Sequence, residues 1–217
     1  MTERMVFGAV LAVSFLLGSI PWGVIISRVF YHTDVRQHGS GNIGTTNAFR
    51  TMGKVGGVAV FLLDFGKGLL AGWLATVMVT NFVLPYGGLH SLSMNAFLGA
   101  AFFGCVTGHI FSPWLNFKGG KGIAVAIGCL FMTYGPVISV LELTIFAVLV
   151  LATRYVSVGS IASAAACPFF ALYCFWGDWP AVILCTAGAS FVVWAHRGNI
   201  ARLRAGTESR IGSKGDK

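Results

Sequence analysis

Three polar segments stand out in an otherwise apolar chain, and they carry the residue types that could do chemistry. They are Gly39–Arg50 (GSGNIGTTNAFR), Phe117–Gly122 (FKGGKG) and His196–Arg210 (HRGNIARLRAGTESR). All three combine glycine with fixed positive charge, and the first and third add asparagine. If they lie on one side of a membrane, they can converge on a single phosphate-bearing substrate at the lipid surface.

Phosphate binding is the chemistry that these residue types favour. Clustered glycines let backbone N–H groups turn toward an anion. Arg50 offers a planar fork of donors, and Lys118 and Lys121 flank a glycine pair. One unit charge about 4 Å from a phosphate oxygen contributes roughly 4 kcal/mol at an effective dielectric of 20, so several contacts can hold a dianion. Neutral donors also follow the glycines of the first segment: Ser40, Asn42, Thr45, Thr46 and Asn47.

Two nucleotide-binding motifs are excluded. The spacing of Gly39, Gly41 and Gly44 fits GxGxxG, but a membrane helix rather than a strand precedes it. FKGGKG is not a Walker A motif, because Gly122 stands where Ser or Thr is required. The alternative to a substrate site is a set of ordinary positively charged loops. The density of Gly, Asn, Ser and cations on one face argues against that alternative.

Several ionisable residues lie within the apolar stretches. Asp64 and Lys67 are three residues apart and share a helix face. Because a charge at mid-membrane costs about 2.5–3.5 kcal/mol, we expect the two to pair, with a wall of the polar site as the alternative. Glu142 is alone in its stretch and is placed near the outer surface. His109 is expected to be a hydrogen-bonded structural residue, whereas His196 directly follows the last apolar stretch in a basic setting.

Composition identifies the class of protein that positions these segments. The chain has 217 residues, of which 56% are hydrophobic and 10% are charged, against about 25% charged in soluble domains. This indicates a polytopic helical membrane protein. The net charge of +8 lies in loops and the tail, which favours membrane topology and anionic ligands over nucleic acid. The five cysteines lie in apolar stretches without metal-ligand spacing and are expected to be small buried hydrophobes.

Seven membrane-spanning helices are predicted in a single domain covering residues 1–217. The N-terminal apolar run is expected to be a retained span, since no clear signal-peptide cleavage site follows it. The run 123–153 would be roughly 46 Å long as one helix, so we divide it near Gly135-Pro136. The turn signal at residues 177–180 divides the last run. The predicted spans are 5–30, 55–80, 94–115, 123–137, 138–153, 157–176 and 180–195.

Charge placement supports this count. With the N-terminus periplasmic or extracellular and the C-terminus cytoplasmic, all but two of the 15 Lys and Arg residues fall in cytoplasmic segments. The exceptions are Arg4, which lies outside, and Lys67, which lies within a span. Six spans would move the basic tail outside, against the positive-inside rule. All three polar segments are therefore predicted to be loops on the cytoplasmic face.

The three segments together resemble the bacterial acyl-phosphate:glycerol-3-phosphate acyltransferase family (PlsY). Its cytoplasmic signatures look like SGNxGxxNxxR, GHxFxxxxxFKGGKG and HxxNIxRLxxGxE, and they occur here in the same order over nearly the whole chain. Ile43 stands where many members carry proline, which removes no functional group. The matching residues are Ser40-Gly41-Asn42, Gly44, Asn47 and Arg50; Gly108-His109, Phe111 and Phe117–Gly122; His196, Asn199-Ile200, Arg202-Leu203, Gly206 and Glu208.

The resemblance implies transfer of a fatty acyl group from acyl phosphate to the sn-1 hydroxyl of glycerol 3-phosphate. The products are 1-acyl-glycerol 3-phosphate and phosphate, in the first step of bacterial phospholipid synthesis. It implies a multi-pass protein of the bacterial cytoplasmic (inner) membrane, with the lipid bilayer and the two substrates as partners. No cofactor, metal or nucleic acid is expected. The enzyme that makes acyl phosphate is a candidate for functional coupling.

The residues fit that reaction without a nucleophile. No histidine has the Asp of an H-x4-D pair, and no Ser-His-Asp or Cys-His arrangement is evident. An activated acyl phosphate mainly needs two phosphates held together and charge stabilised at the reacting carbon. Proton removal is assigned to a substrate phosphate, with His196 as the second candidate base. The acyl tail is expected in a groove between helices, lined by phenylalanines.

We assign the candidate site residues to two groups on this basis. Five are assigned to catalysis: Ser40, Arg50, Lys118, Lys121 and His196. Nine are assigned to substrate binding: Gly41, Asn42, Thr46, Asn47, Gly119, Gly120, Asn199, Arg202 and Glu208. Among them, Asn199, His196 and Arg202 would position the acceptor, and Glu208 would orient neighbouring cations.

A membrane transporter for phosphate or a small organic anion is the main alternative. It also needs many spans and a basic site. Transporters, however, usually place their sites near mid-membrane in broken helices and often contain internal repeats. Here the polar groups gather at one face and no convincing repeat is found, so the enzyme is favoured.

Overall fold

The computed structural model describes residues 2–89 and 91–212, and every regular element within them is helical. This confirms the prediction of an all-α protein. Three short 3-10 helices, η1 (Val35–Gln37), η2 (Leu84–Tyr86) and η3 (Pro113–Leu115), lie in the connections. The α-helices are α1 (Glu3–Ser19), α2 (Trp22–Tyr31), α3 (Thr45–Phe82), α4 (Met94–Ile110), α5 (Ile123–Thr133), α6 (Gly135–Thr153), α7 (Val156–Cys174), α8 (Trp179–Ala195) and α9 (Arg197–Arg204).

The helices are those of a membrane protein, but they are unequal in length. Within the described residues, five segments are long and apolar enough to cross a membrane, and α8 with α9 forms a sixth if their 49° bend lies inside one span. The apolar helix α5 has 11 residues and rises only about 16 Å, roughly half of a hydrocarbon core. The count of seven crossings therefore stays a prediction.

The first predicted span, residues 5–30, is divided into two helices. α1 ends at Ser19 and α2 begins at Trp22, with Pro21 between them. Proline disfavours helical geometry in the residue before it, and Ile20 is accordingly extended, with ψ of 117°. The break frees carbonyl groups inside the bundle. They accept hydrogen bonds from side chains far away in the sequence.

The first polar segment is only partly a loop. α3 begins at Thr45, so Thr45–Arg50 forms the first turns of a helix that continues, after a kink, into the predicted second span. The kink lies at Gly53, which has φ of 69° and ψ of −167°, a conformation that only glycine adopts readily. The expectation of a loop up to the span at residue 55 is thus wrong for these residues.

The divisions of the two later apolar runs are confirmed. α5 ends at Thr133 and α6 begins at Gly135, whose φ is 76°, with Pro136 in the first turn of α6. Glycine supplies the left-handed conformation, and proline fits a first turn because its missing N–H would have no partner there. α7 and α8 are separated by residues 175–178, close to the predicted turn.

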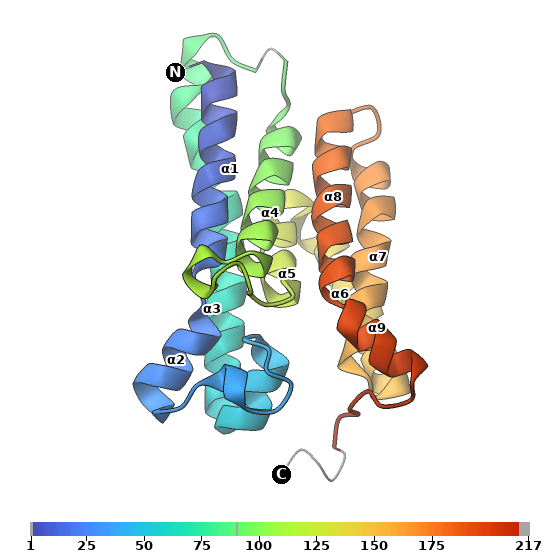
Figure 1. The fold of residues 1–217 in the computed structure, drawn as a ribbon. Helices are drawn as coiled ribbons and strands as arrows, with labels where there is room; N and C mark the ends of the chain where they lie inside the picture. Colours follow the sequence, from blue (N-terminus) through green and yellow to red (C-terminus); the bar gives the residue numbers. More distant parts are fainter. Residues whose placement is uncertain (1, 90, 213–217) are drawn as a thin grey trace.

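The core is built around α4, which runs between α1 on one side and α8 on the other (Figure 1). Close backbone approach requires glycine here: a Cβ on Gly108 would lie 2.0 Å from the Phe15 carbonyl oxygen, and one on Gly18 would lie 2.0 Å from that of Cys105. α3 and α5 meet in the same way at Gly128. Small residues at crossings let apolar helices pack without a hydrophobic driving force.

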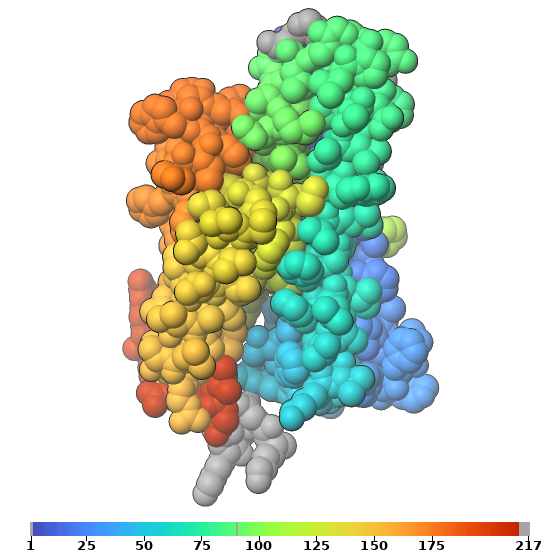
Figure 2. Space-filling view, turned by 180° about the vertical axis from the view of Figure 1, so that it is seen from behind, coloured from blue at the N-terminus to red at the C-terminus, as the bar shows by residue number. Residues whose placement is uncertain are grey.

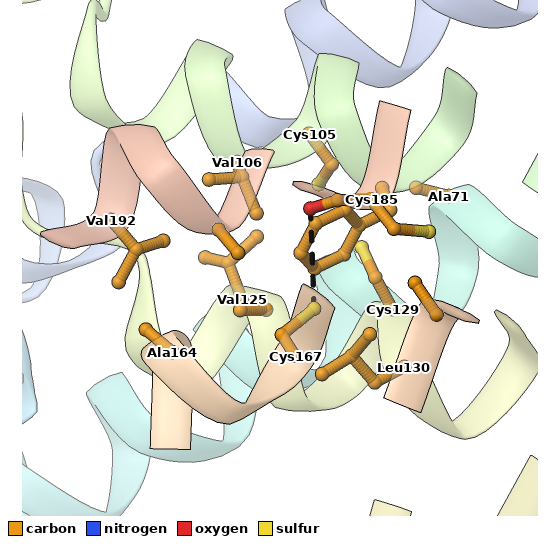
Figure 3. Close-up of a cluster of buried hydrophobic side chains, with 14 of the residues drawn as sticks. Ala71, Cys105, Val106, Val125, Cys129, Leu130, Ala164, Cys167, Cys185 and Val192 are labelled. Atoms are coloured by element: carbon orange, nitrogen blue, oxygen red, sulfur yellow. Dashed lines mark hydrogen bonds between the residues drawn. The ribbon is translucent and has the colours of Figure 1, made fainter. Parts of the chain in front are cut away.

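The predicted role of the cysteines as small buried hydrophobes is confirmed for four of the five. Cys105, Cys129, Cys167 and Cys185 lie in the core between α4, α5, α7 and α8 (Figure 3). The fifth, Cys174, is half-buried. The structure shows all five as free thiols.

One side of the molecule is hollowed. In the space-filling view, an opening separates the C-terminal part of α6 from the N-terminal part of α3 (Figure 2). α5 packs against both helices, but it is too short to fill the space along their whole length. The hollow lies at the end of the molecule that also carries α2 and α9 (Figures 1 and 2).

Candidate active site

The glycine–lysine loop, residues 116–122, folds back onto the end of α4. The N–H of Gly119 donates to the Ile110 carbonyl at 2.9 Å, and the N–H of Gly120 donates to the His109 carbonyl at 3.0 Å. A Cβ on Gly119 would lie 2.0 Å from the carbonyl oxygen of His109. Both glycines are therefore needed for close packing, and their N–H groups are used inside the protein.

Lys121 is the point at which the three polar segments meet. Its side chain is partly buried, and this burial lowers the pKa of its ammonium to about 8. The charges of Arg202 and Arg50 lower it further, while Glu208 opposes them. Residues from all three segments are thus close enough to act on one cation. Lys118 is exposed on the same loop.

The third segment is organised by Glu208. Its carboxylate accepts from Asn199 Nδ2 at 2.6 Å and from Arg202 Nε at 2.7 Å. Partial burial acts to raise the pKa of Glu208, but these hydrogen bonds outweigh it and hold the pKa below its usual value. The predicted role of Glu208 in orienting neighbouring groups agrees with these contacts.

The segment after α9 is tied to the turn between α6 and α7. Arg154 Nη2 donates to the Ile211 carbonyl at 2.9 Å, and the Ile211 N–H donates to the Arg154 carbonyl at the same distance. Arg210 Nε donates to the Tyr155 hydroxyl at 2.9 Å. Sequence reasoning missed this attachment, because Arg154 and Tyr155 lie outside the three segments. Their place in a basic, aromatic turn between two spans was the available signal.

His196 occupies the bend between α8 and α9. Its ring is buried, and Nδ1 lies 2.8 Å from the Val192 carbonyl oxygen. A carbonyl oxygen can only accept, so the neutral ring carries its proton on Nδ1 and its lone pair on Nε2. The charges of Lys121 and Glu208 both act on this ring, which places His196 beside the other site residues.

Asn47 holds the first segment in shape. Its Oδ1 accepts from the Ser40 N–H at 2.8 Å, and its Nδ2 lies 2.8 Å from the Val35 and Asn42 carbonyl oxygens and 3.1 Å from that of His38. The side chain is buried. Asn47, assigned to substrate binding from the sequence, thus has its polar atoms engaged inside the protein, and it acts on the site by shaping the loop.

Several glycine N–H groups that the predicted nest would use are bonded within the protein. The Gly41 N–H donates to the His38 carbonyl at 3.0 Å, and the Gly44 N–H donates to Asn42 Oδ1 at 2.9 Å. With these N–H groups and those of Gly119 and Gly120 already used, side chains are expected to provide much of the contact to an anion. Ser40 and Thr46 are exposed, Asn42 is half-exposed, and Arg50 is half-exposed near Lys121.

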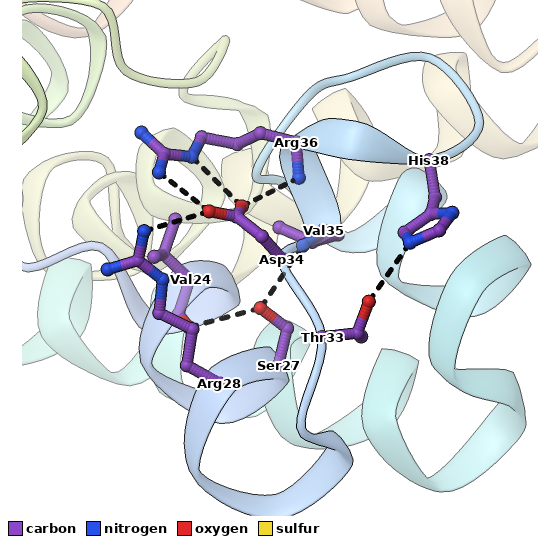
Figure 4. Close-up of polar contacts among 8 residues, drawn as sticks. All are labelled: Val24, Ser27, Arg28, Thr33, Asp34, Val35, Arg36 and His38. Carbon is purple, nitrogen blue, oxygen red and sulfur yellow. Dashed lines mark hydrogen bonds and ion pairs between the residues drawn. The ribbon is translucent and has the colours of Figure 1, made fainter.

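An ion cluster closes the turn between α2 and the first segment (Figure 4). Asp34 Oδ2 lies 2.9 Å from Arg28 Nη2 and 2.7 Å from Arg36 Nη2. The hydrogen bonds from Arg36 hold the pKa of Asp34 well below its usual value. Ser27 adds a hydroxyl that accepts from the Val35 N–H. Arg28 and Arg36 are therefore committed to the fold of this turn.

An apolar cleft lies between α5, α6, α7 and α8, beside the site. Its lining includes Ile123 and Val192, which are near Lys121 and His196 in the sequence, and the rings of Phe102 and Phe146. Glu142 also lines it, with a buried side chain whose Oε2 lacks a partner among the described residues. The placement of Glu142 near the outer surface of the membrane stays a prediction, and its carboxyl faces the protein interior.

The pairing of Asp64 with Lys67 is confirmed. Lys67 Nζ lies 2.8 Å from Asp64 Oδ1 and 3.0 Å from Nδ1 of His109, and all three side chains are buried. The hydrogen-bonded role expected for His109 is confirmed as well. In residues 2–89 and 91–212, no group of three or more His, Cys, Asp and Glu side chains is arranged to hold a metal ion.

Comparison with known proteins gives one family. The model described as glycerol-3-phosphate acyltransferase matches residues 8–206. A protein of that name from Thermosynechococcus vestitus is 36% identical over 215 residues, which cover 98% of this chain and 99% of the relative. One from Gloeobacter violaceus is 38% identical over 201 residues, covering 93% of each chain.

Two solved structures have the same fold. Both are crystal structures of PlsY, described as an integral membrane glycerol 3-phosphate acyltransferase. The glycerol 3-phosphate form has a TM-score of 0.81 and 32% identity, covering 95% of this chain and 96% of that chain. The lysophosphatidic acid form has a TM-score of 0.78 and 30% identity, covering 95% of each. With a family match over most of its length, this chain belongs to the glycerol-3-phosphate acyltransferase family.

Proposed function

We propose that this enzyme transfers a fatty acyl group from an acyl phosphate to the sn-1 hydroxyl of glycerol 3-phosphate. The observation that carries the proposal is the family match over residues 8–206. The charges of Arg50, Arg202 and Glu208, which all act on Lys121, support it. A site with several cations suits a reaction between an acyl phosphate, which is a mixed anhydride, and a phosphate ester. The solved structures of the similar PlsY carry, by their descriptions, glycerol 3-phosphate and lysophosphatidic acid, which are the proposed acceptor and product.

The step needs no covalent enzyme intermediate. The acceptor hydroxyl oxygen attacks the acyl carbon, the bond from that carbon to the phosphate oxygen breaks, and inorganic phosphate leaves. The hydroxyl proton goes to a substrate phosphate oxygen. His196 Nε2, with its free lone pair, is the second candidate acceptor. Holding both reactants together supplies much of the rate, and fixed cations stabilise the charge that develops on the carbonyl and leaving-group oxygens.

The candidate side chains divide between the two substrates. Arg50, Lys118, Lys121 and the Ser40 hydroxyl contact phosphate and the reacting centre. Arg202, Asn199 and His196 position the acceptor, with Glu208 holding the first two in place. Gly119 and Gly120 contribute by letting the lysine loop lie against α4.

The acyl tail enters the cleft between α5 and α8. The cleft begins near Ile123 and Val192 and is lined mainly by apolar side chains, two phenylalanines among them. A chain placed there has its activated end toward the cations and its methylene groups away from water. This arrangement is supported by Ile123 and Val192, which line the cleft and lie close in sequence to Lys121 and His196.

The proposed setting is the cytoplasmic face of a bacterial inner membrane. Seven crossings, with α5 as a short fourth one, keep the basic loops on one side in agreement with the positive-inside rule. Residues 1–217 act as one domain. A water-soluble enzyme that makes acyl phosphate would deliver its product to this face.

The test is direct. Purified protein in detergent or lipid is mixed with a long-chain acyl phosphate and glycerol 3-phosphate, and both phosphate and lysophosphatidate are measured. We expect the two products in equal amounts and only when the acceptor is present. Replacing acyl phosphate with acyl-CoA should give no turnover. Product formation from acyl-CoA, or phosphate release without an acceptor, contradicts the proposal.

A further inference from the structure

The ammonium group of Lys67 has three polar partners in the middle of the bundle. Its Nζ lies 2.8 Å from Asp64 Oδ1, 2.8 Å from the Ile20 carbonyl oxygen and 3.0 Å from His109 Nδ1. An ammonium group has three N–H donors and no acceptor. Two of these contacts are hydrogen bonds and the third is an ion pair, and each partner comes from a different part of the chain.

The contact with Lys67 determines how His109 faces the site. Because the ammonium can only donate, Nδ1 of His109 accepts and the ring proton lies on Nε2. That nitrogen faces the lysine loop: a Cβ on Gly120 would lie 2.2 Å from it. The His109 carbonyl also accepts from the Gly120 N–H at 3.0 Å. Ring and backbone of His109 thus both contact the residue next to Lys121.

The other end of the same loop is anchored at the same place. Ile20, which accepts from Lys67, lies in the break between α1 and α2. Its neighbour Ser19 accepts from Ser112 Oγ through its carbonyl at 2.7 Å and from Trp114 Nε1 through its hydroxyl at 2.8 Å. The connection from α4 to α5 is therefore held at its start through Ser19 and at its end through His109.

We infer that Lys67 and His109 are positioning residues for acyl transfer, which hold the lysine loop so that Lys118 and Lys121 face the substrates. An ionisable group inside a membrane helix is costly unless it is paired, and where it is retained a functional role is the default expectation. Packing of α3 against α4 needs no charge, whereas placing a glycine loop to within a fraction of an ångström needs directional contacts. The inference rests on the proposed function.

A double-mutant cycle tests the contact between His109 and the loop. Gly120→Ala puts a methyl group against the His109 ring, and we expect kcat/KM to fall at least tenfold. His109→Asn keeps an acceptor for Lys67 at the position of Nδ1 but removes the ring, and we expect a loss of a few-fold. The double variant should regain much of the activity that Gly120→Ala loses, since the methyl group then has space. If the losses in kcat/KM of the two single variants multiply in the double variant, the inference is overturned.

A second measurement separates positioning from general stability. Hydrogen exchange of the amides in residues 117–122 should become faster in Lys67→Gln and His109→Ala. In His109→Ala, which leaves the Asp64–Lys67 ion pair in place, exchange in α7 should stay unchanged. Lys67→Arg, which keeps the donors, should restore slow exchange in part. Thr133→Val, a buried change on α5 away from the loop, serves as the matched control and should change neither exchange nor kinetics.

The outcomes distinguish the two proposals. If the unmodified protein gives no acyl-phosphate-dependent turnover, the proposed function fails, and the exchange data still report on the loop. If it does turn over, and His109→Ala keeps both wild-type kinetics and slow loop exchange, the positioning role is wrong. Faster exchange together with a loss in kcat/KM supports it.

Discussion

Lys67 and Lys121 are both shielded lysines in an apolar protein, but their surroundings are opposite. Lys67 is buried with an ion-pair partner and two further acceptors within 3.0 Å. Lys121 is partly buried near two guanidinium groups, Arg202 and Arg50, and has Glu208 as the carboxylate that acts on it. The charge of Lys67 is balanced by a carboxylate within the protein, whereas Lys121 has more positive than negative charge acting on it.

The difference separates a structural cation from a binding cation. A paired lysine such as Lys67 keeps its position whether or not substrate is present. A cation held among other cations, such as Lys121, is unfavourable in the empty site and becomes favourable when an anion arrives. Repulsion that a phosphate relieves is a source of binding energy, whereas the Lys67 contacts stabilise the arrangement of the helices and the lysine loop.

The largest expected effect is the loss of Lys67 alone. Lys67→Met leaves the buried carboxylate of Asp64 without its partner, and we expect the free energy of unfolding to fall by about 3–5 kcal/mol. Thermal unfolding in detergent measures this. Removing both charges, in Asp64→Asn/Lys67→Met, should recover most of the stability. If Lys67→Met alone melts at the wild-type temperature, the description of Lys67 as a structural cation is contradicted.

The loss of Lys121 should affect turnover and leave the fold intact. Lys121→Ala and Arg50→Ala are each expected to lower kcat/KM at least about tenfold, which is about 1.4 kcal/mol of transition-state binding. The melting temperature of Lys121→Ala should not fall, because burial and the neighbouring guanidinium groups disfavour the charge of Lys121 in the empty site. Lys54, an exposed cation near the kink of α3, supplies the control. Lys54→Ala should retain wild-type kinetics. Equal losses of kcat/KM in all three variants would contradict the site assignment.

A smaller effect is expected from pH. The pKa of Lys121 is lowered from 10.5 to about 8, so in the empty site the cation is lost as the pH rises through about 8. We expect kcat/KM to decline above that pH. Lys121→Arg should remove the decline, since guanidinium stays charged. Because the unfolded chain binds the proton more tightly than the folded one, stability of the empty protein should rise between pH 8 and 10.5. A kcat/KM that stays constant between pH 8 and 10.5 contradicts the predicted decline.

Glu208→Gln should have the smallest effect of the four. Its carboxylate raises the pKa of Lys121 and fixes Asn199 and Arg202. We expect KM for glycerol 3-phosphate to increase roughly threefold to tenfold, which is the net contribution of one typical hydrogen bond. The decline in kcat/KM should also begin at a lower pH than in the wild type. Comparing pH profiles of the two proteins measures this shift, and an upward shift refutes the assigned role.

Local sequence was enough for the secondary structure and for the candidate residues. Apolar runs predict the helices because burial in lipid demands internally bonded backbone. Pro21 shows the limit of that approach. Its effect on the helix is local and could have been predicted, but a continuous apolar run suggested one span, and the division into α1 and α2 was missed.

The roles of individual site residues were harder to predict. A glycine-rich loop with polar side chains reads as a phosphate nest, yet the N–H groups of Gly41, Gly44, Gly119 and Gly120 are bonded within the protein. Asn47 reads as a substrate ligand and holds the loop. Sequence shows which groups can form hydrogen bonds, but their partners are chosen by distance and direction.

By itself, the sequence determined the class of protein, the three polar segments and the likeness to an acyltransferase family, because composition and motif spacing are properties of the chain alone. Only the tertiary structure decided which of the two shielded lysines has its charge balanced by groups of the protein. That depends on contacts such as those of Lys67 with Ile20 and His109, which are distant in sequence and lie within 3.0 Å of its Nζ only after the helices pack. The energy of a charge depends on such neighbours, so the chemistry of the site follows from the fold.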